Sequence, residues 1–136
     1  MTAPNAQPGP LTQRALALKD QNDTMQQAVT DALTLVASRP AEAYDLCIQT
    51  MDKCDAYFKA EAEFLEAIGA KSEQVIEAQK SASETRAQLL YATGQAAFLL
   101  NKLPEARSAF QKAMALLDEL NPMRLMVRMA LANLPE

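Results

Sequence analysis

The sequence predicts an all-α protein folded as an antiparallel helical bundle of about five helices. Apolar residues make up 49% of the 136 positions, yet aromatic residues make up only 5% and tryptophan is absent. Ala, Leu and Met supply most of the apolar residues, and these favour helices, whereas strands favour β-branched and aromatic residues. Three glycines are too few for the turns of an all-β chain of this length.

Residues 1–10 are expected to be a disordered lead-in, and residues 11–136 a single helical domain. The lead-in holds three prolines and one glycine, and it lacks both the basic residues and the apolar core of a secretory signal. Apolar runs such as Ala96–Leu100 are far shorter than the ~20 residues of a membrane span. We therefore expect a cytoplasmic protein that does not insert into membranes.

The first helical region is predicted in two parts. Leu11–Lys19 is expected to form a short helix, and the polar stretch at residues 20–24 is expected to interrupt it. Asp23 and Gln26 have the spacing of a capping pair at a helix start, so a second helix is expected from there to about Ser38. The proline at position 40 then suits the first turn of the next helix.

Two long helices joined at Gly69 are the main architectural prediction. The first covers about residues 41–68 and the second about residues 72–101, each with mostly apolar or small residues at alternating spacings of three and four. Gly69 suits the left-handed position that ends a helix, and so short a turn makes the two helices antiparallel. The first seam comprises Tyr44, Cys47, Met51, Cys54, Phe58, Glu61, Leu65 and Ile68, and the second comprises Val75, Ala78, Ala82, Thr85, Leu89, Ala92, Ala96 and Leu99.

The two cysteines lie seven residues apart on the first of these helices. At ~1.5 Å of rise per residue their backbones are about 10 Å apart, which exceeds the roughly 7 Å limit for a disulfide. Cys47 and Cys54 are therefore expected to be buried, unreactive thiols, which suits a reducing compartment.

Two shorter helices are expected after a turn at residues 103–104. They cover about residues 105–120 and 122–134, the second opening with Asn121-Pro122. The last helix has apolar residues on more than one side, so it either packs back on the chain or contacts a partner. Its Met123, Met126 and Met129 are candidate partner-binding residues, because methionine adapts to many surfaces.

Residues 90–117 (LYATGQAAFLLNKLPEARSAFQKAMALL) resemble a tetratricopeptide repeat. Leu90 stands at the position of the family's large first-helix residue, and Gly94 at the position where a small residue lets the paired helices touch. The second helix repeats the small–large–small pattern of the family. That pattern consists of Ala106, Phe110 and Ala113.

A fainter copy of the repeat lies around Gln27–Met51, where Ala43 and Cys47 align with Ala106 and Phe110. Larger residues than Thr93 and Ala97 are usual in the family, and its closing proline comes late here. The resemblance implies a tetratricopeptide-like array that binds a protein or peptide in a groove lined by first helices. Tyr91, Gln95 and Phe98 are the candidate lining, unless they serve only in core or surface packing.

The sequence offers little for catalysis or metal binding. There is no histidine, two cysteines seven apart do not match a zinc site, and no glycine-rich phosphate loop occurs. The glutamates at positions 61–84 are expected to form a solvated face, although carboxylates paired across the hairpin could act as acid and base or hold a metal ion. With 13 basic residues scattered among 17 acidic ones, nucleic-acid binding is not expected.

The sequence therefore predicts a non-enzymatic interaction module without cofactor or metal. Its expected partner is a protein or peptide, bound through the groove and the apolar last helix, and a chaperone-like role falls within this class. The alternative is a structural homo-oligomer whose heptad seams pair between chains. The two readings differ in whether the seams are buried within one chain.

Overall fold

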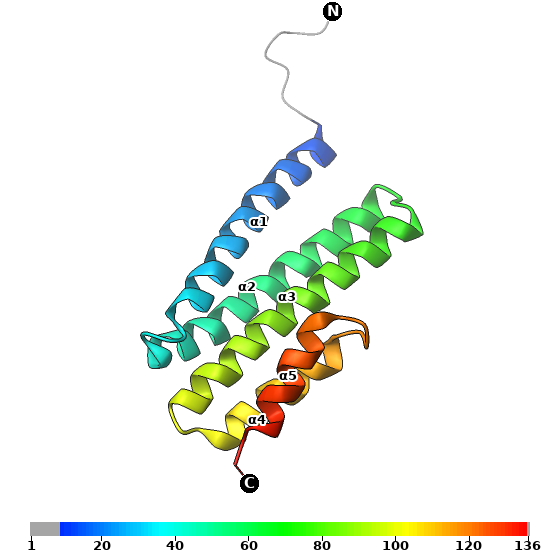
Figure 1. Ribbon diagram of the computed structural model, residues 1–136. Coiled ribbons are helices and arrows are strands. Elements are labelled where there is room, and N and C mark those ends of the chain that lie inside the picture. Colours follow the sequence, from blue (N-terminus) through cyan, green and yellow to red (C-terminus); the bar gives the residue numbers. More distant parts are fainter. Residues whose placement is uncertain (1–8, 136) are drawn as a thin grey trace, which may run out of the picture.

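The computed structural model describes residues 9–135 and shows five α-helices and no strand among them. Each helix packs against the next in chain order, and the path reverses at every turn (Figure 1). The predicted all-α helical bundle is confirmed. The helices are α1 (Pro10–Leu35), α2 (Pro40–Ala67), α3 (Ser72–Leu99), α4 (Leu103–Leu116) and α5 (Pro122–Ala132).

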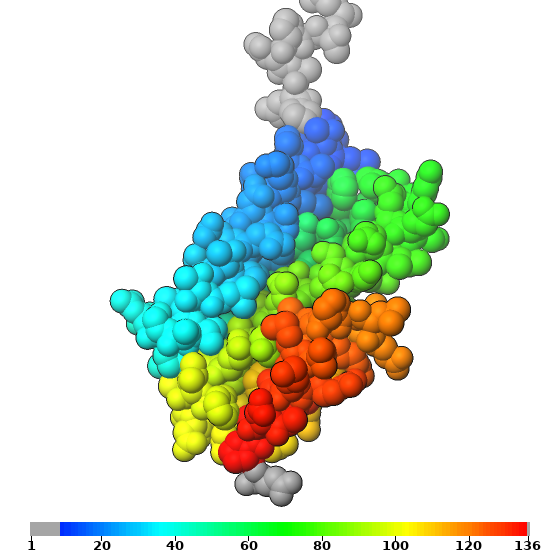
Figure 2. All heavy atoms as spheres, viewed as in Figure 1, coloured from blue at the N-terminus to red at the C-terminus, as the bar shows by residue number. Residues whose placement is uncertain are grey.

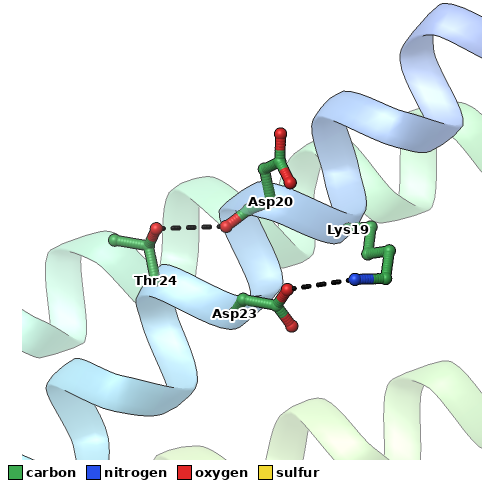
Figure 3. Close-up of polar contacts among 4 residues, drawn as sticks. All are labelled: Lys19, Asp20, Asp23 and Thr24. Carbon is green, nitrogen blue, oxygen red and sulfur yellow. Dashed lines mark hydrogen bonds and ion pairs between the residues drawn. The ribbon is translucent and has the colours of Figure 1, made fainter.

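Helix α1 is continuous, so the predicted break at residues 20–24 is wrong. Within that polar stretch the ammonium of Lys19 lies 3.3 Å from a carboxylate oxygen of Asp23, and the Thr24 hydroxyl donates to the Asp20 carbonyl (Figure 3). These groups are solvent-exposed. The stretch contains neither glycine nor proline, so its polar residues only lengthen the solvent face of the helix.

Most of the predicted lead-in, residues 1–8, lies outside the described residues. Its last two residues belong to the start of α1, because Gly9 is the N-cap and Pro10 occupies the first turn. Proline is well placed there, since its missing N–H has no partner in a first turn. The helical region therefore begins at Pro10, one residue before the predicted start.

The turn between α2 and α3 has the geometry that Gly69 predicts. Gly69 has φ +65°, its N–H donates to the Glu66 carbonyl, and the Ala70 N–H donates to the Leu65 carbonyl. Asn101 ends α3 in the same way, with φ +61° and the Lys102 N–H donating to the Ala97 carbonyl. Both ends are Schellman motifs, which satisfy the last carbonyls of a helix.

Helices α1, α2 and α3 share one core. Cys47 and Cys54 are fully buried in it and are not bonded to each other, as the spacing predicted. The last residue of each seam contributes less, because Ile68 and Leu99 remain about half exposed. The core comprises Met25, Val29, Ala32, Cys47, Cys54, Tyr57, Phe58, Ala82, Leu89 and Ala92.

Helix α3 lies at the centre of the bundle and carries a second core on another face (Figure 1). Beyond the predicted seam, Ala87 and Ala97 are fully buried against α4 and α5. The small residues allow this, since an alanine on either side of a helix lets a neighbour approach closely. The second core comprises Ala87, Ala97, Ala106, Phe110, Ala113, Leu117, Val127 and Leu134.

Candidate functional site

An apolar groove of about 480 Å³ lies where the end of α1, the second half of α3 and helix α5 come together. Figure 2 shows α1 and α5 on either side of α3, which lies between them. A groove of this size falls within the range of ligand and peptide pockets. It is lined by Val36, Ala37, Tyr91, Gln95, Phe98, Leu99, Phe110, Met126, Met129, Ala130, Asn133 and Leu134.

The groove brings together five of the six residues that the sequence singled out for partner binding. They come from two helices between which α4 lies in the sequence: Tyr91, Gln95 and Phe98 are on α3, and Met126 and Met129 are on α5. Met123 does not line the groove. It packs, half-buried, against the second core, where it supports α5.

Helix geometry places the three α3 residues in one stripe. Tyr91, Gln95 and Phe98 are spaced at i, i+4 and i+7, so they fall on the same face of α3. The Tyr91 ring packs at 5.7 Å, centroid to centroid, from the ring of Phe110, which forms part of the groove lining. Phe98, nearer the helix end, is 44% exposed.

Helix α5 is held by its first turn and by one buried face. The Asn121 side chain accepts from the Met123 N–H at 3.0 Å and caps the start of the helix. The Arg124 guanidinium donates to the carbonyls of Met114 and Leu117 at 3.0 and 2.9 Å, so it joins α5 to the end of α4. Val127 is fully buried, which fixes the rotation of α5 about its axis.

This rotation settles how the last helix uses its apolar residues. Val127 faces the core, whereas Leu125, Met126 and Met129 are 59%, 49% and 57% exposed. The sequence left self-burial and exposure to a partner as alternatives. In the structure, α5 buries one apolar face and exposes another.

Charge is absent from the groove lining. The α3 segment at residues 87–101 has no charged residue, and the segment at residues 120–135 has only Arg124 and Arg128. At the end of α1, residues 32–41 have only Arg39. The three segments that form the walls therefore carry no carboxylate, although the whole chain has a net charge of −4.

The titratable groups with a perturbed pKa lie outside the groove. Burial raises the pKa of both thiols, that of Cys54 to about 11. Burial and a hydrogen bond to Glu61 raise the pKa of Tyr57 to about 12. A raised thiol pKa means less thiolate, so burial makes the cysteines poor nucleophiles.

Within residues 9–135, no group of three or more Cys, Asp or Glu side chains could hold a metal ion. The predicted glutamate face lies along the α2–α3 hairpin, where Glu61, the acceptor of the Tyr57 hydroxyl, is part-buried and Glu63, Glu66, Glu73 and Glu77 are exposed. No described helix is long and apolar enough to cross a membrane.

Several lining residues were not predicted as site residues. Val36 and Ala37 come from the end of α1, and Asn133 and Leu134 from the end of the chain. Periodicity identifies which residues share a face of one helix, but the meeting of three helix ends is set by tertiary packing. Leu99 was predicted to pack in the α3 seam, but it is exposed and lines the groove. Its place as the last residue of that seam is the one feature of the sequence that could have indicated its exposure.

The chain matches no protein-family model, no curated protein and no solved structure. Its functional assignment therefore depends on the groove and on the helices that form it.

Proposed function

We propose that the chain is a non-enzymatic protein–protein interaction module that holds an apolar segment of a protein or peptide in the α1–α3–α5 groove. One observation carries the proposal. Phe98, Leu99, Met126 and Met129 come from two helices, are 44–57% exposed and line the same groove. Scattered exposed apolar residues are normal, but a contiguous set of large ones around a concave surface marks an interaction site.

The tetratricopeptide resemblance supports this proposal. In the α3–α4 hairpin, Ala106, Phe110 and Ala113 are buried, as the small–large–small pattern requires, and Gly94 lies against Phe110. In the fainter copy, Ala43 is fully buried at the corresponding place near the start of α2. One feature departs from the family. The 28-residue α3 is much longer than its repeat-like part, which begins at Leu90.

The burial of the seams favours this proposal over a homo-oligomer built through them. Cys47, Cys54 and Leu89 are fully buried between α1, α2 and α3 of one chain. Pairing of these residues between chains would require the helices to separate first. The groove and α5 carry accessible apolar side chains that such pairing does not involve, among them Phe98, Met126 and Met129.

The experiment compares three forms of the full-length chain as immobilised bait for proteins of its native host. They are the wild type, a groove variant with Met126→Glu and Met129→Glu, and a matched control with Ile76→Glu. Ile76 is 62% exposed on α3 and lies outside the groove lining, so it tests the effect of a surface glutamate alone.

The expected result is a protein retained by the wild type and the Ile76→Glu control but lost from the groove variant. Circular dichroism first establishes that all three baits are folded. If every retained protein also binds the groove variant, the groove is not the binding site and the proposal is overturned. Light scattering on the wild type identifies self-association, which would give a dimer that the groove variant dissociates.

A further inference from the structure

We infer that Met126 and Met129 form a reversible oxidation site, at which a hydroperoxide such as hydrogen peroxide changes the groove wall from apolar to polar. The modification is a property of α5 alone. Its consequence for a bound partner rests on the proposed function, because it would regulate the same groove. Three features of the structure lead to this site: the accessibility of the sulfur-containing side chains, the place of the two methionines in the groove, and the independence of the cores from both.

Two of the described methionines are more accessible than the rest. Met126 and Met129 are 49% and 57% exposed, and α5 lies on the outer surface of the bundle (Figure 2). Met25 is 2% exposed in the first core. The remaining described methionines are partly buried and pack against the two cores. They are Met51, Met114 and Met123. An oxidant in the solvent therefore reaches the two groove methionines first.

The cysteines are protected from the same oxidant. Thiolates react readily with peroxides, but Cys47 and Cys54 are fully buried, and burial raises the pKa of both thiols. Little thiolate therefore forms near neutral pH. A thioether has no proton to lose, so its sulfur is nucleophilic without ionising. Among the described residues, the exposed sulfur-containing side chains are those of Met126 and Met129.

The reaction adds one oxygen atom to each thioether. A sulfur lone pair attacks one oxygen of hydrogen peroxide, so an S–O bond forms as the O–O bond breaks. The departing hydroxide takes the proton of the transferred hydroxyl, and the products are a sulfoxide and water. The sulfur loses two electrons, which the peroxide gains. Methionine sulfoxide reductases reverse the step, in which two thiols become a disulfide and the oxygen leaves as water.

Oxidation changes the groove because both methionines line it. They are three residues apart on α5, so they lie on the same side of the helix. The lining carries no charged side chain, and two sulfoxides would place strongly polar groups in this wall. An apolar segment bound against them would remove the sulfoxide oxygens from water without supplying a hydrogen bond, which costs free energy. Oxidation therefore weakens the binding of an apolar partner.

The fold tolerates the change, because neither methionine belongs to a core. Helix α5 is held instead by the buried Val127 and by the hydrogen bonds of Arg124 to the end of α4. Oxidation of Met25 would have the opposite effect, since it would place a polar group in the first core. The accessible pair is thus the pair whose oxidation alters the groove and leaves the bundle intact.

The first test treats the full-length chain with hydrogen peroxide and follows oxygen uptake by peptide mass spectrometry. Trypsin cuts after Arg124 and Arg128, so Met126 and Met129 fall in separate peptides. We expect both to be oxidised about tenfold faster than Met25, with the two cysteines unmodified. If Met25 is oxidised as fast as the groove pair, accessibility does not single out α5 and the oxidation site is rejected.

The second test measures the apolar surface of the native chain by hydrophobic interaction chromatography. The oxidised wild type should elute earlier than the reduced form, and methionine sulfoxide reductases should restore its retention. A double variant with Met126→Leu and Met129→Leu keeps the wall apolar but has neither thioether, so peroxide should leave its retention unchanged. The matched control is Met123→Leu on the same helix, which should shift as the wild type does.

Two results of the second test would overturn the site. An equal shift of the leucine double variant would assign the effect to other residues. A loss of helical circular dichroism on oxidation of the wild type would show that the two methionines support the fold rather than an open groove.

The bait experiment tests the regulatory consequence separately. A protein captured by the wild type should be lost when the bait is oxidised, and the peroxide-treated leucine double variant should still retain it. A captured protein that stays bound to the oxidised wild type would contradict regulation of the groove. If no protein is captured, the proposed function fails, whereas the peptide mapping and the chromatography still decide whether α5 carries the oxidation site.

Discussion

The ring of Phe110 lies directly on the backbone of Gly94. A Cβ atom at position 94 would stand 2.5 Å from Cε1 and 2.8 Å from Cζ of that ring. The ring cannot easily move away, because Phe110 is 2% exposed and Tyr91 packs against it. This contact sets how closely α4 approaches α3, and Phe110 in turn forms part of the groove lining.

Gly94→Ala should therefore destabilise the protein. Alanine in place of glycine favours a helix by about 1 kcal/mol. The new methyl group overpacks the α3–α4 contact, which costs about 1–3 kcal/mol. We expect a net loss of about 1 kcal/mol in the free energy of unfolding by urea titration. In a double-mutant cycle with Phe110→Leu, part of the loss should be recovered; a stabilising Gly94→Ala would contradict the contact.

Gly69 and Asn101 both have a left-handed backbone conformation at the end of a helix. Substitutions at these two positions should have opposite effects on stability. Gly69→Ala places a side chain at φ +65° and should cost about 1 kcal/mol, although no atom stands within 4 Å of the new Cβ. Asn101→Gly removes a side chain at φ +61° and should stabilise by a few tenths of a kcal/mol. Thermal unfolding measures both changes. Equal melting temperatures for Gly69→Ala and the wild type would show that the turn adopts another conformation.

Local backbone preferences predicted more of the fold than the polar or apolar character of the side chains did. Gly69 and the helix periodicity predict the α2–α3 hairpin, because both act through local backbone preferences. The polar residues at 20–24 predict a break that does not form, because exposure along a helix and departure from a helix give the same polar pattern. In the second core, the repeat resemblance indicated Ala106, Phe110 and Ala113, but the burial of Ala87 and Ala97 on α3 was not predicted, since alanine is compatible with either a buried or an exposed face.

The candidate site was predicted by residue type and assembled by tertiary packing. The repeat resemblance selected Tyr91, Gln95 and Phe98, and the apolar pattern selected the methionines of α5, yet nothing in the sequence joins the two groups. The structure joins them because Val127 and Arg124 fix α5 against α4. Met123 has the same side chain as Met126, but its place on the helix turns it towards the core.

Both thiols should be unreactive in the folded protein. Desolvation raises the pKa of Cys47, and it raises the pKa of Cys54 from 9.0 to about 11, with Asp55 adding to the rise and Arg86 opposing it. The thiolate is the nucleophile. At pH 8 the thiolate fraction of Cys54 should be about a hundredfold lower than that of an ordinary thiol. A disulfide reagent should titrate no thiol per native chain and two after urea unfolding. Rapid reaction of the native chain would show that α2 opens readily.

Stability should fall at alkaline pH. The folded chain holds the protons of Cys54 and Tyr57 more tightly than the unfolded chain, since their pKa values rise from 9.0 and 10.0 to about 11 and about 12. Their contribution is therefore fully present below about pH 9 and is lost as the pH rises towards 12.

Urea titrations from pH 7 to pH 11.5 measure the effect, and Tyr57→Phe with Cys54→Ala is the control. This double variant lacks both of these groups, so its free energy of unfolding should decline less steeply above pH 9 than that of the wild type. Parallel declines would contradict this role of Cys54 and Tyr57 and would leave Cys47, whose pKa burial also raises, as the source of the loss.

Neighbouring residues on α5 should respond in opposite ways to the same substitution. Met126 is 49% exposed in the groove, so Met126→Glu should change the free energy of unfolding by less than about 1 kcal/mol. Val127 is fully buried, so Val127→Glu places a carboxylate in an apolar core and should cost more than about 3 kcal/mol. Urea titration of the two variants measures this difference. If Met126→Glu unfolds the chain as Val127→Glu does, the methionine is part of the core and the groove is closed in solution. If only Val127→Glu unfolds it, the exposed side of α5 makes little contribution to folding and is available for contact with a partner.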